Sequence, residues 1–316
     1  MSFWRFVLRR SLIGIVQVAI LLALIFVLSL LMPGDAADVQ SNDLTTAAQR
    51  DQTRAVLGLD VAPLQRFLSW CANALTGDFG MSYARGEPVG SLIVEPFLMS
   101  AALAALTTAL LIPIGFGAGF VAGLRPGSPA DRMITTISVA LDSIPDFVLA
   151  VVLITYLAIG WQWFPATFVG ADLHRAITHP AHLVLPLTVM VARVAAPLVR
   201  LVRAGVIDTM ATPYIAAARR HGVTRRSLLL RHVAPNALAP AMQDLGRTGD
   251  SLLSGVLVVE AIFVMPGVAT TLLDAVGSRD QPVILAILLV TGLAAIVVNG
   301  LIDMAGTRMV PGRVQA

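Results

Sequence analysis

The chain has 316 residues, of which 57% are hydrophobic and only 13% are charged, so it is far too apolar for a soluble domain. All 22 basic residues are arginine, which excludes the lysine of a phosphate-binding P-loop and Schiff-base catalysis. The single cysteine, Cys71, excludes an intramolecular disulfide. A net charge of +3 could indicate nucleic acid, but arginines beside apolar runs are more typical of cytoplasmic anchoring, so we expect no nucleic-acid partner.

The first apolar run covers residues 11–32 and follows Arg5, Arg9 and Arg10. This arrangement predicts a transmembrane helix whose N-terminus stays in the cytoplasm. A cleaved signal peptide is the alternative, but its apolar core would be only about 7–15 residues long. We therefore interpret the run as a retained membrane helix.

Residues 33–97 form the longest polar stretch, with eight acidic residues against four arginines. It contains turn-rich pieces such as Gly77-Asp78-Phe79-Gly80. We place this acidic stretch outside the cytoplasm, and its length predicts a small folded extracytoplasmic insertion.

Residues 98–124 are free of charge and carry Gly115, Gly119 and Gly123 at four-residue spacing. That spacing puts three glycines on one helix face, where another helix can approach closely. We predict a packing face there, followed by a short basic turn on the cytoplasmic side.

Residues 133–161 predict the next span, although they contain Asp142, Pro145 and Asp146. The two carboxylates flank the proline one turn apart, so they could face a common aqueous route where the proline loosens the helix. The alternative is that they only lie near the outer interface of the membrane.

Residues 162–182 are polar and include His174, His179 and His182. Imidazoles can bind nickel or zinc, but histidines in a loop are usually no more than polar residues, so we expect no metal site. Residues 183–203 predict a further span.

Residues 204–235 form a long loop with five arginines at positions 219–231 and a single acid, Asp208, which predicts a cytoplasmic location. Two more apolar stretches complete an all-α membrane protein whose N- and C-termini are both cytoplasmic. Its six predicted transmembrane helices cover about residues 11–32, 98–124, 133–161, 183–203, 236–266 and 283–304.

Polar side chains within a span are costly and usually face a cavity or one another. The span from residue 236 carries such side chains at three- or four-residue spacing, which predicts one polar stripe. The stripe is a candidate translocation path, and the alternative is that its charges pair with each other. Its members are Gln243, Asp244, Arg247, Asp250, Ser251 and Ser254.

The basic loop contains Tyr-Ile-Ala-Ala-Ala-Arg-Arg-His-Gly from Tyr214 to Gly222 and continues through an apolar stretch to Pro240. It resembles the signature loop of ABC importer permeases, E-A-A-x-x-x-G, in the form used by the dipeptide/oligopeptide/nickel permease family. The leading glutamate of that pattern is replaced here by Ala216. Physically, we expect a short helix, a sharp turn at glycine, and a second amphipathic helix with residues 228–230 on one face.

The resemblance covers nearly the whole chain. Its other motifs, in order, are Pro33-Gly34-Asp35, Leu57-Gly58-Leu59-Asp60, Gly77-Asp78-Phe79-Gly80 with Ser82, Pro88-Val89, Ser143-Ile144-Pro145 with Phe147, Val259-Glu260 with Phe263, Pro266-Gly267, Arg279-Asp280 with Pro282, and Asn299 with Asp303.

The resemblance implies a type I ABC importer permease fold with three parts: residues 1–32 as the first helix, 33–97 as the insertion, and 98–316 as the core with its coupling loop at 204–235. In the family this loop contacts the ATPase subunit. The implied contact residues are Tyr214, Ala217, Ala218, Gly222, Val223 and Leu228, of which Ala217, Ala218 and Gly222 form the turn. Glu260 matches a family position, and we expect it, with Asp142, Pro145 and Asp146, to be structural or gating.

The implied partners are a homologous second permease, two ABC ATPase subunits, an extracytoplasmic substrate-binding protein and membrane lipid. ATP and Mg²⁺ would bind the ATPases, so we expect no cofactor and no catalytic residue on this chain, which also lacks the H-E-x-x-H and G-x-S-x-G patterns. Di- and oligopeptides are the leading cargo, with nickel chelates and haem-like molecules as alternatives. The alternative function is an ion-driven secondary transporter or channel, which inverted repeats would favour. A membrane hydrolase and a structural scaffold are weaker alternatives.

Overall fold

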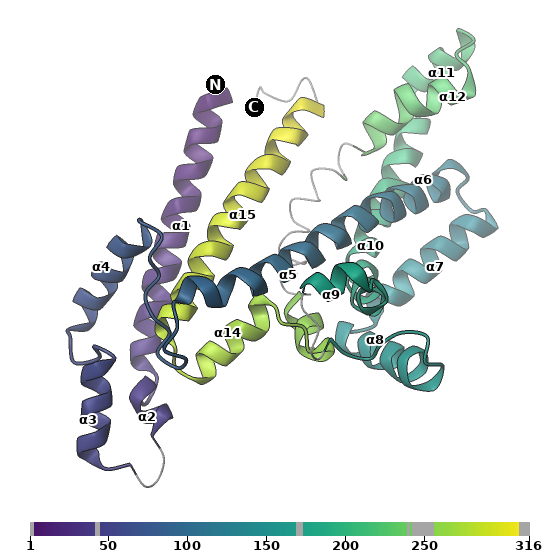
Figure 1. The fold of residues 1–316 in the computed structure, drawn as a ribbon. Helices are drawn as coiled ribbons and strands as arrows, with labels where there is room; N and C mark the ends of the chain where they lie inside the picture. Colours follow the sequence, from purple (N-terminus) through teal and green to yellow (C-terminus); the bar gives the residue numbers. More distant parts are fainter. Residues whose placement is uncertain (1–2, 42–44, 169–172, 239–240, 242–255, 310–316) are drawn as a thin grey trace. The chain divides into compact units, whose positions relative to one another are not determined.

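A computed structural model describes residues 3–41, 45–168, 173–238, 241 and 256–309 (Figure 1). Apart from one isolated bridge between Met81 and Pro88, the regular elements among these residues are all helical. The chain divides into two compact units, Met1–Ser100 with Pro266–Val297, and Ala101–Met265 with Val298–Ala316. The division falls within two long helices, α5 (Val89–Leu111) and α15 (Gln281–Met309).

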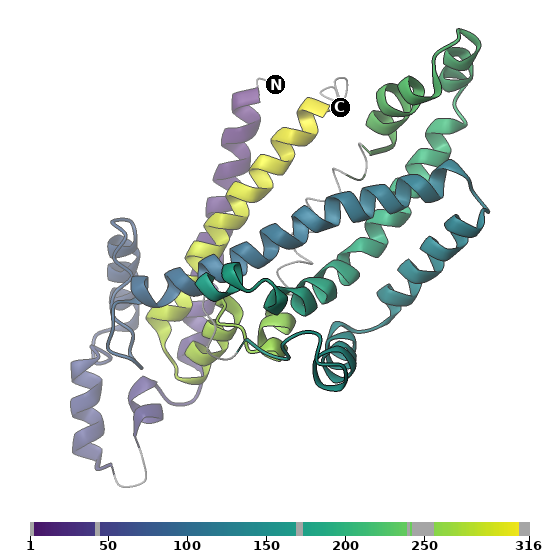
Figure 2. The same cartoon turned by 45° about the vertical axis from the view of Figure 1, so that its right-hand side comes forward.

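In the first unit, α1 (Phe3–Leu31) and α15 lie side by side in both views (Figures 1 and 2). Two glycines allow this approach. A Cβ on Gly14 would lie 2.7 Å from Cγ1 of Ile296, and a Cβ on Gly292 would lie 2.7 Å from Cγ2 of Val18. The small residues therefore face the neighbouring helix at its points of closest contact.

The polar stretch after α1 folds into α2 (Ala36–Gln40), α3 (Ala47–Val56) and α4 (Pro63–Ala74). Asp35 and Asp38 form a capping box on α2. Arg54 of α3 then binds both carboxylates at 2.8 Å. Burial raises the pKa of Asp35, but the hydrogen bonds from Arg54 and from the backbone of α2 outweigh it, so the net pKa is lowered.

A buried carboxylate connects the two sequence segments that make up this unit. Asp280 is only 2% exposed and accepts hydrogen bonds from the hydroxyl of Ser82 and from the backbone N–H groups of Tyr83 and Ala84, the last two at 3.1 Å. Three donors satisfy the buried charge without a cation. Two motifs of the importer-permease pattern, nearly 200 residues apart in sequence, are therefore one structural contact.

The second unit is organised around α10 (Ala181–Met210), against which α6 (Gly117–Leu124) and α7 (Pro129–Ser143) pack (Figures 1 and 2). A Cβ on Gly119 would lie 2.7 Å from the carbonyl oxygen of Val199. Gly115 and Gly123 meet Leu198 and Val206 of α10 in the same way. The predicted glycine packing face is confirmed.

The predicted span over residues 133–161 is not one continuous helix but an interrupted pair of helices. The structure has α7 followed by α8 (Asp146–Leu153) and the π-helical segment η2 (Ile154–Gly160), bent by 103° at the junction. Ile144 is extended, with φ −91° and ψ 122°, because a residue before proline is disfavoured in the helical region. Pro145 then starts the next helix, where its missing N–H does no harm.

Among the residues that the structure describes, four uninterrupted helices are long and apolar enough to cross a membrane, namely Leu8–Leu31, Val89–Leu124, Ala181–Met210 and Gln281–Gly300. Two interrupted pairs also pass, Pro129–Ser143 with Asp146–Gly160 and Val256–Phe263 with Val268–Gly277, and counting each as one span gives six. The predicted all-α membrane fold is confirmed. The cytoplasmic location of the termini and the three-part domain division stay predictions.

The second predicted span starts earlier than expected. The helix begins at Val89, where we predicted residue 98, and it is continuous to Leu124 through the π-helical segment η1 (Ile112–Phe116). Glu95 and Pro96 interrupt the apolar run in the sequence, but the helix carries both near its start.

Candidate functional site

The first residues of the predicted coupling loop, 204–210, continue α10. The next helix of the loop is α11 (Pro213–Arg220), capped at its N-terminus by the hydroxyl of Thr212. Its C-terminus is a Schellman motif. The N–H of Val223 donates to the carbonyl of Ala218 at 3.2 Å, and that of Gly222 donates to Arg219 at 3.1 Å. Gly222 has φ +78°, a left-handed conformation that glycine adopts without steric cost. The predicted change of direction at Gly222 is present.

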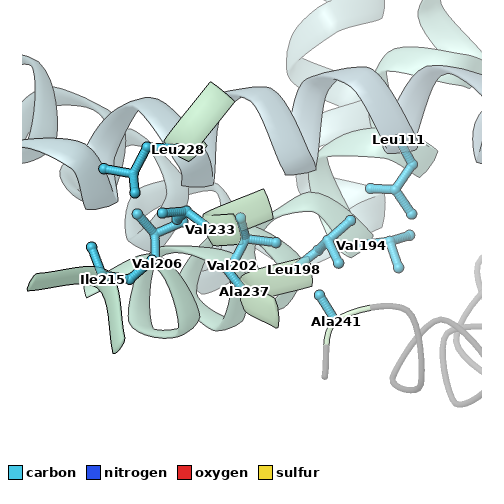
Figure 3. Close-up of a cluster of buried hydrophobic side chains, with 10 residues drawn as sticks. All are labelled: Leu111, Val194, Leu198, Val202, Val206, Ile215, Leu228, Val233, Ala237 and Ala241. Atoms are coloured by element: carbon cyan, nitrogen blue, oxygen red, sulfur yellow. The ribbon is translucent and has the colours of Figure 1, made fainter. Parts of the chain in front are cut away.

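The returning arm of the loop is α12 (Arg225–Ser227) and the π-helical segment η3 (Leu228–Val233). Both arms bury side chains against α10, as Figure 3 shows. Ile215 from α11 and Val233 from η3 are 0% exposed, and Leu228 is 3% exposed. They meet a row of α10 side chains formed by Val194, Leu198, Val202 and Val206. The loop is thus anchored to α10 by its own apolar core.

The six predicted contact residues divide between the anchor and the surface. Tyr214, Ala217 and Gly222 are exposed, Ala218 and Val223 are half-buried, and Leu228 lies in the anchor. The expectation that residues 228–230 share one face is wrong, because Leu228 is 3% and Leu230 is 60% exposed. Successive helical residues point about 100° apart, so three in a row cannot occupy one face.

A polar contact joins the two arms. The hydroxyl of Tyr214 hydrogen-bonds to Nδ1 of His232, and the two rings meet edge to face with centroids 5.5 Å apart. Tyr214 is nevertheless 52% exposed. Its ring therefore remains available on the surface of the loop while its hydroxyl fixes the spacing of the arms.

Three arginines of α10 pair with three aspartates of α7 and α8. Arg203 binds Asp131 with both ends of its guanidinium group, Nε to Oδ1 at 2.5 Å and Nη2 to Oδ2 at 2.8 Å. Asp131 is 3% exposed. It also accepts the N–H of Gly127 at 2.8 Å and the hydroxyl of Thr135 at 3.3 Å. This bidentate pair fixes the start of α7 on α10.

The other two pairs flank the break between α7 and α8. Arg200 binds Asp142 at 2.9 Å, and Arg193 binds Asp146. Asp142 and Asp146 therefore lie on different helices, each held by its own arginine, rather than one turn apart on one helix. Pro145 lies at the break itself. These pairs neutralise charges that would be costly inside a membrane.

Glu260 is completely buried, and its backbone carbonyl accepts the N–H of Met265 at 2.9 Å. Val264, the last residue of the turn before Met265, has φ +53°. Left-handed backbone is unusual for a β-branched residue. The turn therefore carries local strain beside a buried carboxyl.

The predicted translocation stripe, Gln243, Asp244, Arg247, Asp250, Ser251 and Ser254, lies outside the described residues. In the part of the chain that the structure describes, no group of three or more His, Cys, Asp or Glu side chains could hold one metal ion. His182 instead packs edge-on against Phe168, with ring centroids 5.4 Å apart.

Sequence reasoning did not find the partners of Arg193 and Arg200, and it missed the pair of Arg203 with Asp131. One signal was available. Asp131 lies three residues after Ser128, which caps α7, and a carboxylate is favoured in the first turn of a helix. Nothing in that pattern pointed to an arginine 72 residues later in the chain.

The family model for the binding-protein-dependent transport system inner membrane component matches residues 115–314, and the model for the N-terminal region of such components matches residues 3–104. The chain therefore belongs to this family and is an inner-membrane permease subunit of an ABC importer.

Its relatives carry more specific names. The glutathione transport system permease protein GsiC of Escherichia coli (strain K12) is 32% identical to this chain over 299 residues, 95% of each protein. The probable peptide ABC transporter permease protein y4tP of Sinorhizobium fredii is 29% identical over 306 residues, 97% of this chain and 98% of the relative.

Proposed function

We propose that this chain and a second, homologous permease enclose the path of an ATP-driven importer for short peptides, which an extracytoplasmic binding protein delivers. The observation that carries the proposal is similarity over 95% of the chain to a permease named for glutathione, itself a tripeptide, together with similarity to one named for peptides. Both relatives point to small peptide-like cargo of the same class.

Two ATPase subunits would bind ATP and Mg²⁺ and supply the energy, because this chain has no lysine from which to build a P-loop. The coupling loop supports this arrangement. Its exposed tip carries Tyr214, Ala217 and Gly222, while Ile215 and Leu228 lock its base to α10. A rigid-body movement of a bound ATPase would therefore move α10 with the loop instead of flexing the loop alone.

Coupling is tested by co-purification of the tagged chain from its native membrane in mild detergent, using Gly222→Pro. Proline fixes φ near −65° and removes the N–H that donates to Arg219. Gly58→Pro is a matched control, because Gly58 ends α3 in the same motif. It has φ +67°, and its N–H donates to the carbonyl of Ala55 at 3.1 Å. We expect only Gly222→Pro to lose the ATPase subunits while remaining in the membrane.

Cargo is tested by reconstituting the co-purified complex with its binding protein in vesicles and measuring uptake of labelled glutathione and dipeptides. We expect uptake to require ATP and to be competed by unlabelled peptides. Uptake that follows an ion gradient without ATP would overturn the importer mechanism, and competition by nickel chelates or haem alone would overturn the peptide assignment.

A further inference from the structure

The first unit contains a cavity of about 390 Å³ at the ends of two spans. Ser29 and Met32, at and just beyond the C-terminal end of α1, line it, as does Gln281, which begins α15. Both helices are long and apolar enough to cross a membrane. The cavity therefore lies at the depth where the chain leaves the hydrocarbon and reaches the headgroup region.

The wall of the cavity changes from apolar to basic. Ile25 and Leu28 of α1 and Ile284 and Leu288 of α15 line it within the spans. At or beyond the ends of these two spans, the lining is polar and consists of Arg66 of α4, Tyr83, Arg279 and Gln281. A cavity with an apolar body and a polar end fits an amphiphilic ligand better than a soluble ion.

Both arginines have donors without a partner. Nε of Arg66 and Nη1 of Arg279 are buried and make no hydrogen bond to any described residue. A buried donor on a charged group is destabilising unless something accepts from it. Arg279 is held in place by its other nitrogen, Nη2, which donates to the carbonyl of Pro33 at 3.1 Å.

The nearby carboxylates are already engaged. Asp35 lines the cavity but is bound by Arg54. Asp280, next to Arg279 in sequence, accepts from Ser82, Tyr83 and Ala84. Neither carboxylate accepts a hydrogen bond from Nε of Arg66 or Nη1 of Arg279, so the basic end of the cavity is suited to an added anionic acceptor.

We propose that this cavity binds the phosphodiester headgroup of an anionic phospholipid, with Arg66 and Arg279 as donors to the phosphate and an acyl chain along α1 and α15. Guanidinium groups match phosphate oxygens in geometry and charge. Basic pockets between membrane helices select anionic lipids for the same reason. The lipid would tie α4 and the turn before α15 to α1.

The test uses the full chain with its co-purifying subunits in bilayer discs of phosphatidylcholine, with or without phosphatidylglycerol. Native mass spectrometry after detergent exchange counts retained lipids, and the thermal midpoint is measured in both bilayers. We expect phosphatidylglycerol to be retained at least about tenfold over phosphatidylcholine and to raise the midpoint. The variants are Arg66→Gln and Arg279→Gln, with the exposed Arg85→Gln as a control of equal charge change.

Both arginine variants should lose the retention and the rise in midpoint, and Arg85→Gln should keep them. Because each variant is compared between the two bilayers, a variant that is less stable in both still reports lipid selectivity. Equal retention of the two lipids, or selectivity that survives in both arginine variants, would overturn the proposal. So would an equal rise in midpoint with soluble glycerol 3-phosphate in phosphatidylcholine alone, because the site would then take a free anion.

Discussion

Gly119 offers a sharp test of the packing between α6 and α10. In Gly119→Ala the new Cβ would lie 2.7 Å from the carbonyl oxygen of Val199 and 2.7 Å from Cβ of Val202. Neither atom is the end of a flexible side chain, so neither can rotate away. Carbon atoms pack best at about 3.5–4.0 Å, so the two helices must separate by roughly 1 Å.

Overpacking of this kind costs about 1–3 kcal/mol, and we expect Gly119→Ala to destabilise the protein by that amount. The control is Gly117→Ala on the same helix. A Cβ on Gly117 would meet nothing within 4 Å, and replacing glycine by alanine within a helix gains about 0.5–1 kcal/mol. The same substitution two residues apart should therefore have opposite signs.

Thermal unfolding of the purified chain with its partners, in one detergent and at one concentration, measures the difference. Each midpoint is compared with that of the unchanged chain. Equal midpoints for Gly117→Ala and Gly119→Ala, or a higher one for Gly119→Ala, would show that α6 and α10 do not pack at this distance. Loss of stability in both would point to a general intolerance of side chains on α6.

Three further predictions concern polar contacts and backbone strain. Asp131→Ala should destabilise the protein by about 3 kcal/mol because it leaves Arg203 unpaired, and the double Ala variant at both positions should lose less than the sum of the single changes. The lowered pKa of Asp35 contributes stability that is present above the unfolded pKa of about 3.9 and is lost as pH falls through the folded value. Arg54→Gln should flatten that acid loss in a pH series of thermal midpoints, and an unchanged series would contradict the assigned cause. Val264→Asn should raise the midpoint by relieving about 1 kcal/mol of left-handed strain, and an unchanged or lower midpoint would mean that the turn is not strained there.

Some features were predictable because they depend on neighbours in the sequence. The glycine spacing at positions 115, 119 and 123 gave the packing face, since helix geometry alone aligns residues four apart. The loop from Tyr214 gave the turn at Gly222 for the same local reason. Pro145 predicted a weak point in the helix, but a proline alone does not determine whether a helix bends slightly or ends there.

The sequence by itself determined that this is a membrane protein, because its long uncharged runs are stable when they are buried in lipid. Only the tertiary structure decided which distant groups pair, such as Asp280 with Ser82 and Asp131 with Arg203. It also decided that Leu228 anchors the coupling loop while Leu230 stays exposed. The physical reason is range. Hydropathy and backbone preference depend on residues within one or two helical turns. The partner of a buried charge or the neighbours of a buried side chain depend on which distant residues the whole fold brings beside it.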